Sequence, residues 1–130
     1  MSQQIVTCDD ETHIVRAIQL KLSLAGFNVR TGRDGQEAWE LIQKSPPDLL
    51  ITDYQMPRLD GLSLCRQLRR NPLTHDLPII LLTAKGFELD WDDLKRELGL
   101  ARVMIKPFSP RELLLTVQQV LQSIGQPVGV

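Results

Sequence analysis

Residues 49–57 read Leu49-Leu50-Ile51-Thr52-Asp53-Tyr54-Gln55-Met56-Pro57, an apolar run that ends on a single carboxylate. Nearly continuous apolarity over residues 49–52 is typical of a short strand buried on both faces, as in a parallel sheet. A loop stiffened by Pro57 follows, so Asp53 stands where the strand ends. We therefore expect a fold organised around this buried strand, with Asp53 as the residue that carries its chemistry.

The same pattern recurs on both sides of this stretch. Short apolar runs predict four more strands, at residues 5–8, 27–31, 78–83 and 101–105, and a segment of helical spacing follows each of the five strands. Strict alternation of strands and helices predicts an α/β domain with a parallel five-stranded sheet and right-handed crossovers. The expected strand order is the flavodoxin-like, doubly wound 2-1-3-4-5, with five helices on the two faces.

The ends of the predicted helices carry their own signals. Asp60, Asp90 and Ser109 each precede a helical segment and are expected to cap it. Gly26 and Gly99 follow helical segments and are expected to end them.

Bulk composition limits the classes of protein to which the chain can belong. It has 130 residues, the length of one domain, and 42% hydrophobic residues, enough for a core. The formal net charge is −1 and the Lys and Arg residues are scattered, which argues against direct binding of nucleic acid or an anionic membrane surface. No apolar stretch approaches the ~20 residues that a membrane span needs.

Cysteine use and the chain ends suggest a cytoplasmic protein. Cys8 and Cys65 lie in apolar periodic segments without a metal-binding pattern, so we expect buried, reduced thiols. The N-terminus lacks a secretory signal. We expect one domain over residues 1–125 and a tail or linker stub over residues 126–130. The sequence leaves open whether the chain stands alone or is part of a larger protein.

Polar residues follow four of the predicted strands. They are Asp9 and Asp10 after the first, Asp53 after the third, Thr83 after the fourth and Lys106 after the fifth. In open parallel sheets the ligand site lies at the carboxyl ends of the strands, so these side chains are expected to converge.

Three carboxylates in one place require compensation. Two unit charges 4 Å apart repel by roughly 4 kcal/mol at an effective dielectric constant of 20. Such a cluster takes up protons or binds a cation, and oxygen-only ligands select a hard ion such as Mg²⁺. Lys106 adds a point charge and Thr83 a hydroxyl donor, both suited to phosphoryl oxygens. The set predicts phosphoryl transfer, with an aspartyl-phosphate on Asp53.

Each residue also has a plainer interpretation. Asp9 and Asp10 would serve equally as a helix-capping pair, Thr83 as an ordinary strand-end residue and Lys106 as a surface lysine. Their joint placement at predicted strand ends favours the site.

The chain resembles the receiver domain of two-component response regulators, with a fold like that of the chemotaxis regulators. The resemblance spans residues 5–124. The matching pieces, in order, are Asp9-Asp10-Glu11, Gly32-Arg33-Asp34-Gly35-Gln36-Glu37-Ala38, Asp53-Tyr54-Gln55-Met56-Pro57, Asp60-Gly61, Thr83-Ala84 and Lys106-Pro107-Phe108.

The resemblance implies a role for each site residue. Asp53 would accept a phosphoryl group from a histidine kinase or a histidine phosphotransfer protein. Asp10, Asp53 and the backbone carbonyl of Gln55 would bind Mg²⁺ directly, and Asp9 would bind it through water. Lys106 and Thr83 would bind the phosphoryl oxygens, and the Lys106–Pro107 bond would be cis.

The resemblance further implies a signalling module rather than a turnover enzyme. Such a module catalyses only its own phosphorylation and a slow autodephosphorylation, and passes its state to a downstream effector protein or a fused effector domain. Gln55 and Lys85 occupy positions that tune the hydrolysis. Ile14 lies off the apolar stripe of its helix, and it either packs at the helix edge or docks a histidine-containing partner.

One position departs from the family. Val103 stands where receivers usually carry Tyr or Phe, the ring that reports the phosphorylated state. We therefore expect a non-standard readout, through the segment that contains Phe87 and Trp91. Gln118, Gln119 and Gln122 replace charges common in dimerising receivers, which favours a monomer or a weak dimer.

Two other functions remain open at this stage. A degenerate receiver would act as a phosphorylation-independent interaction domain. This alternative is retained because Val103 stands where receivers usually carry the reporting ring. A phosphohydrolase of the haloacid dehalogenase kind would also form an aspartyl-phosphate. It normally needs an acid two residues after the nucleophile, where this chain has Gln55, and it usually carries a cap domain.

Overall fold

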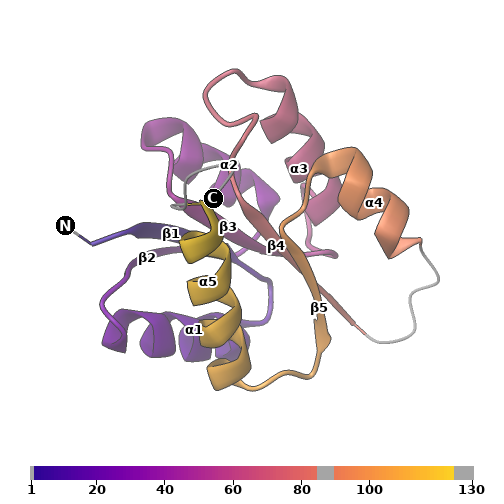
Figure 1. Cartoon of the computed structure of the whole chain (residues 1–130). Coiled ribbons are helices and arrows are strands. Elements are labelled where there is room, and N and C mark those ends of the chain that lie inside the picture. Colours follow the sequence, from indigo (N-terminus) through magenta and orange to yellow (C-terminus); the bar gives the residue numbers. More distant parts are fainter. Residues whose placement is uncertain (1, 85–89, 125–130) are drawn as a thin grey trace.

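The computed structural model describes residues 2–84 and 90–124. Five parallel strands form one sheet in the order β2-β1-β3-β4-β5, as predicted (Figure 1). The strands are β1 (Gln4–Cys8), β2 (Asn28–Gly32), β3 (Leu49–Asp53), β4 (Ile79–Ala84) and β5 (Arg102–Lys106). The expectations for Lys85, Phe87 and the tail 126–130 concern residues outside the described ranges.

Five helices cover the two faces of the sheet, which confirms the doubly wound α/β fold. They are α1 (Thr12–Leu24), α2 (Gly35–Lys44), α3 (Gly61–Arg70), α4 (Trp91–Leu98) and α5 (Pro110–Ile124). Helices α1 and α5 lie together on one face, and α2, α3 and α4 lie on the other (Figure 1).

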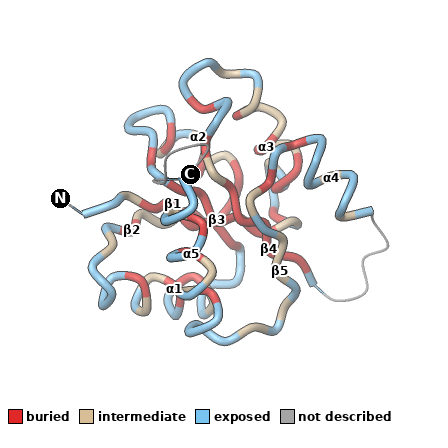
Figure 2. Tube along the Cα trace, in the orientation of Figure 1, coloured by how far each residue is buried: buried red, intermediate tan, exposed pale blue. Residues whose placement is uncertain are grey.

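The central strand is buried on both faces, as its apolar run predicts. All five residues of β3 are buried, and Figure 2 shows burial concentrated along the middle strands. Leu49 and Ile51 pack against α1 and α5, whereas Leu50 packs into the core beneath α2, α3 and α4. Alternating side chains therefore pack into two separate cores, because successive residues of a strand point to opposite faces.

The predicted helix ends are confirmed. The carboxylates of Asp60 and Asp90 accept hydrogen bonds from backbone N–H groups in the first turns of α3 and α4, and Ser109 Oγ accepts one from Glu112 N. Gly26 and Gly99 adopt positive φ angles of 99° and 62° after α1 and α4.

Several strand ends were predicted one residue short. Strands β3, β4 and β5 extend through Asp53, Ala84 and Lys106. The correction has a simple cause, since the ladder is made by backbone groups and a polar side chain does not stop it. Asp53 and Lys106 are consequently held by the sheet rather than by a loop.

The chain closes tightly behind Asp53. A Cβ placed on Gly61 would lie 2.1 Å from the carbonyl oxygen of Asp53, so only glycine fits at the start of α3.

Both cysteines are buried free thiols, as predicted. Among residues 2–84 and 90–124, no helix combines the length and apolar character that crossing a membrane requires.

Candidate functional site

Strand register brings the predicted site residues to one edge of the sheet. Asp53 pairs with Leu82 of β4, and Ala84 at the end of β4 pairs with Lys106 of β5. Asp9 follows β1, where its N–H donates to the carbonyl of Gly32 (3.3 Å). The convergence expected from the strand ends is therefore present.

Lys106 joins the carboxylates of this edge. Its Nζ donates to Asp9 Oδ2 at 2.8 Å and to Glu11 Oε2 at 2.9 Å, and it lies 3.3 Å from Asp53 Oδ1. The Lys106 side chain is 15% exposed, whereas that of Asp9 is fully buried. One ammonium group thus bridges the buried acids and the solvent-facing Glu11.

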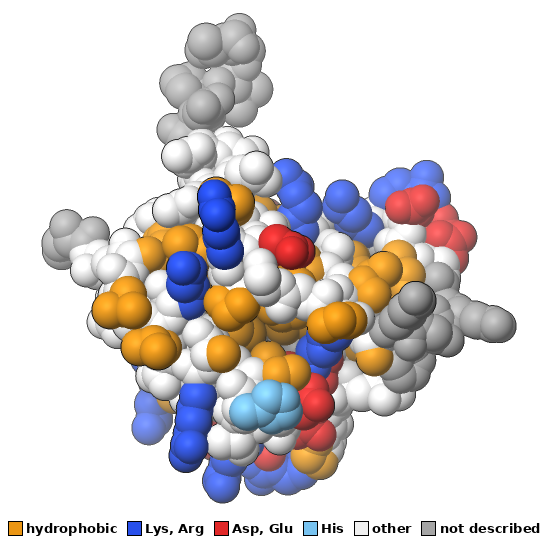
Figure 3. All heavy atoms as spheres, turned by 90° about the horizontal axis from the view of Figure 1, so that it is seen from below, with side chains coloured by type: hydrophobic (Ala, Val, Ile, Leu, Met, Phe, Trp, Pro, Cys, Tyr) orange, Lys and Arg blue, Asp and Glu red, His pale blue; other side chains and the backbone are white. Residues whose placement is uncertain are grey.

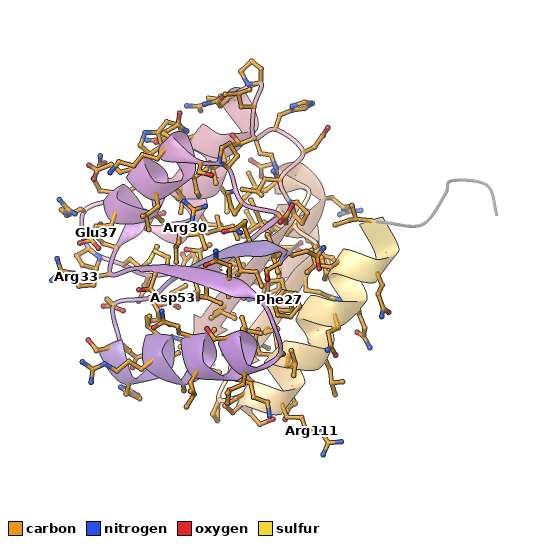
Figure 4. All side chains as sticks on the ribbon, turned by 90° about the vertical axis from the view of Figure 1, so that its left-hand side faces the viewer. Phe27, Arg30, Arg33, Glu37, Asp53 and Arg111 are labelled. Carbon is orange, nitrogen blue, oxygen red and sulfur yellow. The ribbon has the colours of Figure 1, made fainter. Side chains whose placement is uncertain are left out.

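The acids themselves form a compact oxygen cluster. Asp9, Asp10 and Asp53 each offer a carboxylate oxygen within 4.8 Å of the others. Asp9 and Asp53 are buried, while Asp10 is exposed. Figure 4 shows Asp53 well inside the outline of the molecule, in contrast to Arg33 and Glu37 at its edge. All donors are hard oxygens, so the set fits a small divalent cation such as Mg²⁺.

Electrostatics leave negative charge uncompensated at this cluster. Burial raises the pKa of Asp53 to about 6, and the charge of Asp9 raises it too, against the opposing effect of Lys106. Burial likewise raises the pKa of Asp9, although Lys106 opposes it. Burial lowers the pKa of Lys106, but its bonds to Asp9 and Glu11 outweigh that effect and hold it above its ordinary value. One lysine does not fully balance the buried acids, and a cation would.

Gln55 lines the surface of the site, whereas Thr83 is buried beside it. A surface hollow contains Gln55 together with Asp10, Asp53 and Lys106. Thr83 is buried next to this edge, and its hydroxyl donates to the carbonyl of Ala84 (3.4 Å). Among the described residues, Thr83 therefore makes no hydrogen bond to a site carboxylate. The Lys106–Pro107 peptide is cis, as the resemblance implied.

Two contacts near the site were not predicted from the sequence. Glu11 belongs to the acidic motif but received no role, and its side chain reaches Lys106 across 95 residues of chain. Arg58 makes a two-pronged ion pair with Asp34, at 2.9 and 3.0 Å, which ties the loop after β3 to the start of α2. The adjacency of Glu11 to the acidic pair was the only sequence signal for the first contact.

Tyr54 and Trp91 lie on the α4 side of the sheet near the site, whereas Phe108 packs with the core on the α1 and α5 side. Val103 packs, partly buried, against the core beneath α2, α3 and α4, as do Tyr54 and Trp91. The Tyr54 and Trp91 rings meet edge to face, with centroids 5.4 Å apart. Tyr54 N also donates to Asp53 Oδ1 (3.0 Å), so the Tyr54–Trp91 pair adjoins the acid cluster.

A parallel 2-1-3-4-5 sheet with an acid cluster and a lysine at its carboxyl edge defines the class of phosphoacceptor receiver modules. The model of the response regulator receiver domain family matches residues 5–118, and the chain belongs to this family. It is therefore a receiver domain of the two-component signalling type.

Curated relatives are transcriptional regulators about twice as long. The alkaline phosphatase synthesis transcriptional regulatory protein PhoP of Bacillus subtilis is 42% identical over 122 residues, covering 94% of this chain and 50% of that protein. The phosphate regulon transcriptional regulatory protein PhoB of Pseudomonas aeruginosa is 38% identical over 125 residues, covering 96% and 54%. The chain thus spans about half the length of these relatives.

Solved structures show the same fold. The chemotaxis response regulator CheY4 of Vibrio cholerae superposes with a TM-score of 0.84 at 28% identity, covering 92% of this chain and 99% of that one. The receiver domain of the Francisella response regulator 1452 gives 0.84 at 28% identity, covering 95% and 99%. The predicted likeness to chemotaxis regulators is confirmed.

Proposed function

We propose that this chain is the phosphoacceptor module of a two-component phosphorelay and that Asp53 is the acceptor. The observation that carries the proposal is Lys106 Nζ, which lies 3.3 Å from Asp53 and 2.8 Å from Asp9 at the oxygen cluster. A carboxylate beside an ammonium group and a cation site has the parts that phosphoryl transfer needs.

The transfer would proceed by attack of an Asp53 carboxylate oxygen on the phosphorus of a phosphohistidine. A P–O bond forms as the P–N bond breaks, and the leaving imidazole nitrogen keeps the electron pair. Tyr54 N, which donates to Asp53 Oδ1 at 3.0 Å, orients the nucleophile. Lys106 is placed to meet the phosphoryl oxygens, and Thr83, at the end of β4, is proposed as their second donor.

Mg²⁺ would be held by Asp10, Asp53 and the backbone carbonyl of Gln55, with Asp9 bound through water. Both oxygens of Asp9 already accept hydrogen bonds, from Glu11 N and Lys106 Nζ, which supports the indirect role. Asp10 is exposed, and its carboxylate accepts no hydrogen bond from the described residues. When bound, the ion would offset the charge on the phosphoryl oxygens.

The face formed by α1 and the start of α5 is proposed to receive the histidine kinase or phosphotransfer protein. The hollow that contains Asp53 and Lys106 continues over Ile14, Ala17 and Phe108. Figure 3 views the molecule from below the orientation of Figure 1 and shows hydrophobic side chains on this side, with Lys and Arg scattered among them. Replacing Ile14 by Asp is expected to slow transfer without unfolding the domain, and unchanged transfer kinetics would count against docking there.

Output would pass to an effector protein or a fused effector domain. The relatives named above are transcriptional regulators of which this chain spans about half, which supports an effector acting on transcription. With a net charge of −1 the module itself is not proposed to touch nucleic acid. We place it in the cytoplasm as a monomer or weak dimer.

A degenerate, phosphorylation-independent receiver is the second candidate, because Val103 lacks the usual reporting ring. The phosphohydrolase alternative is disfavoured by membership of the receiver family and by Gln55 at the position of its general acid.

The deciding experiment is incubation with a small phosphodonor and Mg²⁺, followed by intact mass measurement. Wild type and the exposed-site control Asp76→Asn are expected to gain one phosphate, and Asp53→Asn none. No adduct on wild type would favour the degenerate receiver, and an adduct retained by Asp53→Asn would overturn the choice of acceptor.

A further inference from the structure

We infer that Glu11 is a positioning residue that holds Lys106 before loading and is displaced by the phosphoryl group on Asp53. This inference rests on the proposed function. It concerns a residue to which neither the acidic motif nor the cation site assigns a role.

The ammonium group of Lys106 donates two hydrogen bonds, to Asp9 and Glu11, and makes a longer ion pair with Asp53. It carries three N–H bonds. Three carboxylates surround it in the described structure, Asp9 at 2.8 Å, Glu11 at 2.9 Å and Asp53 at 3.3 Å. Turning more of its N–H groups toward phosphoryl oxygens on Asp53 requires Lys106 to release Asp9 or Glu11.

Asp9 is the costly partner to release. Its side chain is fully buried, and its second oxygen already accepts a hydrogen bond from Glu11 N (3.0 Å). Breaking the Lys106 contact would leave a buried carboxylate oxygen without a donor.

Glu11 is the partner that leaves easily. Its side chain is 47% exposed, so water replaces the lost contact. Its carboxylate also has no part in starting α1, since Glu11 is the N-cap residue and makes no side-chain cap. The helix start uses only the Glu11 carbonyl, which accepts from Ile14 N and Val15 N. Glu11 therefore competes with the phosphoryl group for Lys106 without carrying the fold.

The test measures affinity for beryllofluoride, an anionic mimic of the phosphoryl group, by nuclear magnetic resonance at saturating Mg²⁺. Glu11→Gln removes the charge. Glu11→Asp keeps the charge but is one methylene too short to reach Lys106. Both are expected to bind beryllofluoride roughly two- to fivefold more tightly than wild type, the size of one exposed ion pair. In urea, Glu11→Gln is expected to lose only the contribution of that one ion pair, and Glu11→Asp to offset the same loss with a better N-cap side chain.

The control is Glu40→Gln, an exposed acid on α2, for which wild-type affinity is expected. Tighter binding in Glu11→Gln alone would mean general repulsion of the anion and would overturn competition for Lys106. Unchanged or weaker binding in both Glu11 variants would also overturn it. Wild type that binds no beryllofluoride would overturn the proposed function and this inference together.

Discussion

Tyr54 and Trp91 pack edge to face, with ring centroids 5.4 Å apart and ring planes at 86°. Tyr54 directly follows Asp53 and donates its N–H to that carboxylate, and Trp91 is the first residue of α4. The pair therefore joins the acid cluster to α4 by an aromatic contact. It offers a readout route in a receiver whose Val103 has no ring to move.

Replacing Trp91 by Leu is expected to weaken the response of α4 to loading. Such an aromatic pair contributes about 0.5–1.5 kcal/mol beyond burial, so the shift in the α4 population should fall by about two- to tenfold. The measurement is the change in α4 amide shifts on adding beryllofluoride and Mg²⁺. Trp39→Leu on α2 is the matched control. Changes confined to the site in wild type, or an undiminished α4 response in Trp91→Leu, would contradict this route.

Asp53→Asn is expected to stabilise the metal-free protein at neutral pH. The folded-state pKa of Asp53, about 6, lies above its ordinary 3.8, so between these values Asp53 is more protonated in the folded protein than in the unfolded chain. The contribution of Asp53 to the free energy of unfolding therefore falls as pH rises through this window.

The expected gain at pH 7.5 is about 1–3 kcal/mol, and it should disappear below pH 4. Urea unfolding of wild type and Asp53→Asn at both pH values measures it, with exposed Asp76→Asn as control. Equal stability at pH 7.5 would mean that Asp53 is compensated in the folded state.

Mg²⁺ affinity is expected to fall in acid. A proton and the cation compete for Asp53, so below about pH 6 the association constant should drop by up to tenfold per pH unit. Titrations at pH 5, 6 and 7.5 at constant ionic strength provide the measurement. A constant affinity across this range would show that Asp53 is not a ligand.

Gly61→Ala is expected to destabilise the fold by about 3 kcal/mol. The new Cβ would lie 2.1 Å from the carbonyl oxygen of Asp53, a backbone atom that cannot swing aside. Because the strain falls on Asp53 itself, loading should slow as well. Urea unfolding tests the first effect, with Ser63→Ala in the same helical turn as control. Wild-type stability in Gly61→Ala would contradict the close approach.

The Arg58–Asp34 ion pair is expected to contribute about 1 kcal/mol of coupling. Arg58 has φ 66°, a conformation that Asn also tolerates, and Asp34 caps α2 through Glu37 N. Arg58→Asn and Asp34→Asn therefore remove the ion pair while keeping the backbone and the cap. A double-mutant cycle in urea measures the coupling, and strictly additive effects would contradict it.

The apolar pattern by itself determined the architecture. The continuous run over residues 49–52 predicted a strand buried on both faces, and β3 is that strand. Alternation of strands and helices predicted a parallel sheet, and the order 2-1-3-4-5 was expected as the common flavodoxin-like arrangement among the few that right-handed crossovers leave. The rule that strand ends converge then placed Asp9, Asp53 and Lys106 together, and the fold confirms it.

Only the tertiary structure decided which side chains contact one another. Lys106 bonds Glu11 as well as Asp9, Arg58 pairs with Asp34, and Tyr54 meets Trp91. These contacts join segments 24 to 97 residues apart and depend on loop conformations such as the positive φ of Arg58. Hydrophobic periodicity carries no information about them, because it reports which face of an element is buried and not where a polar side chain beyond its end will reach.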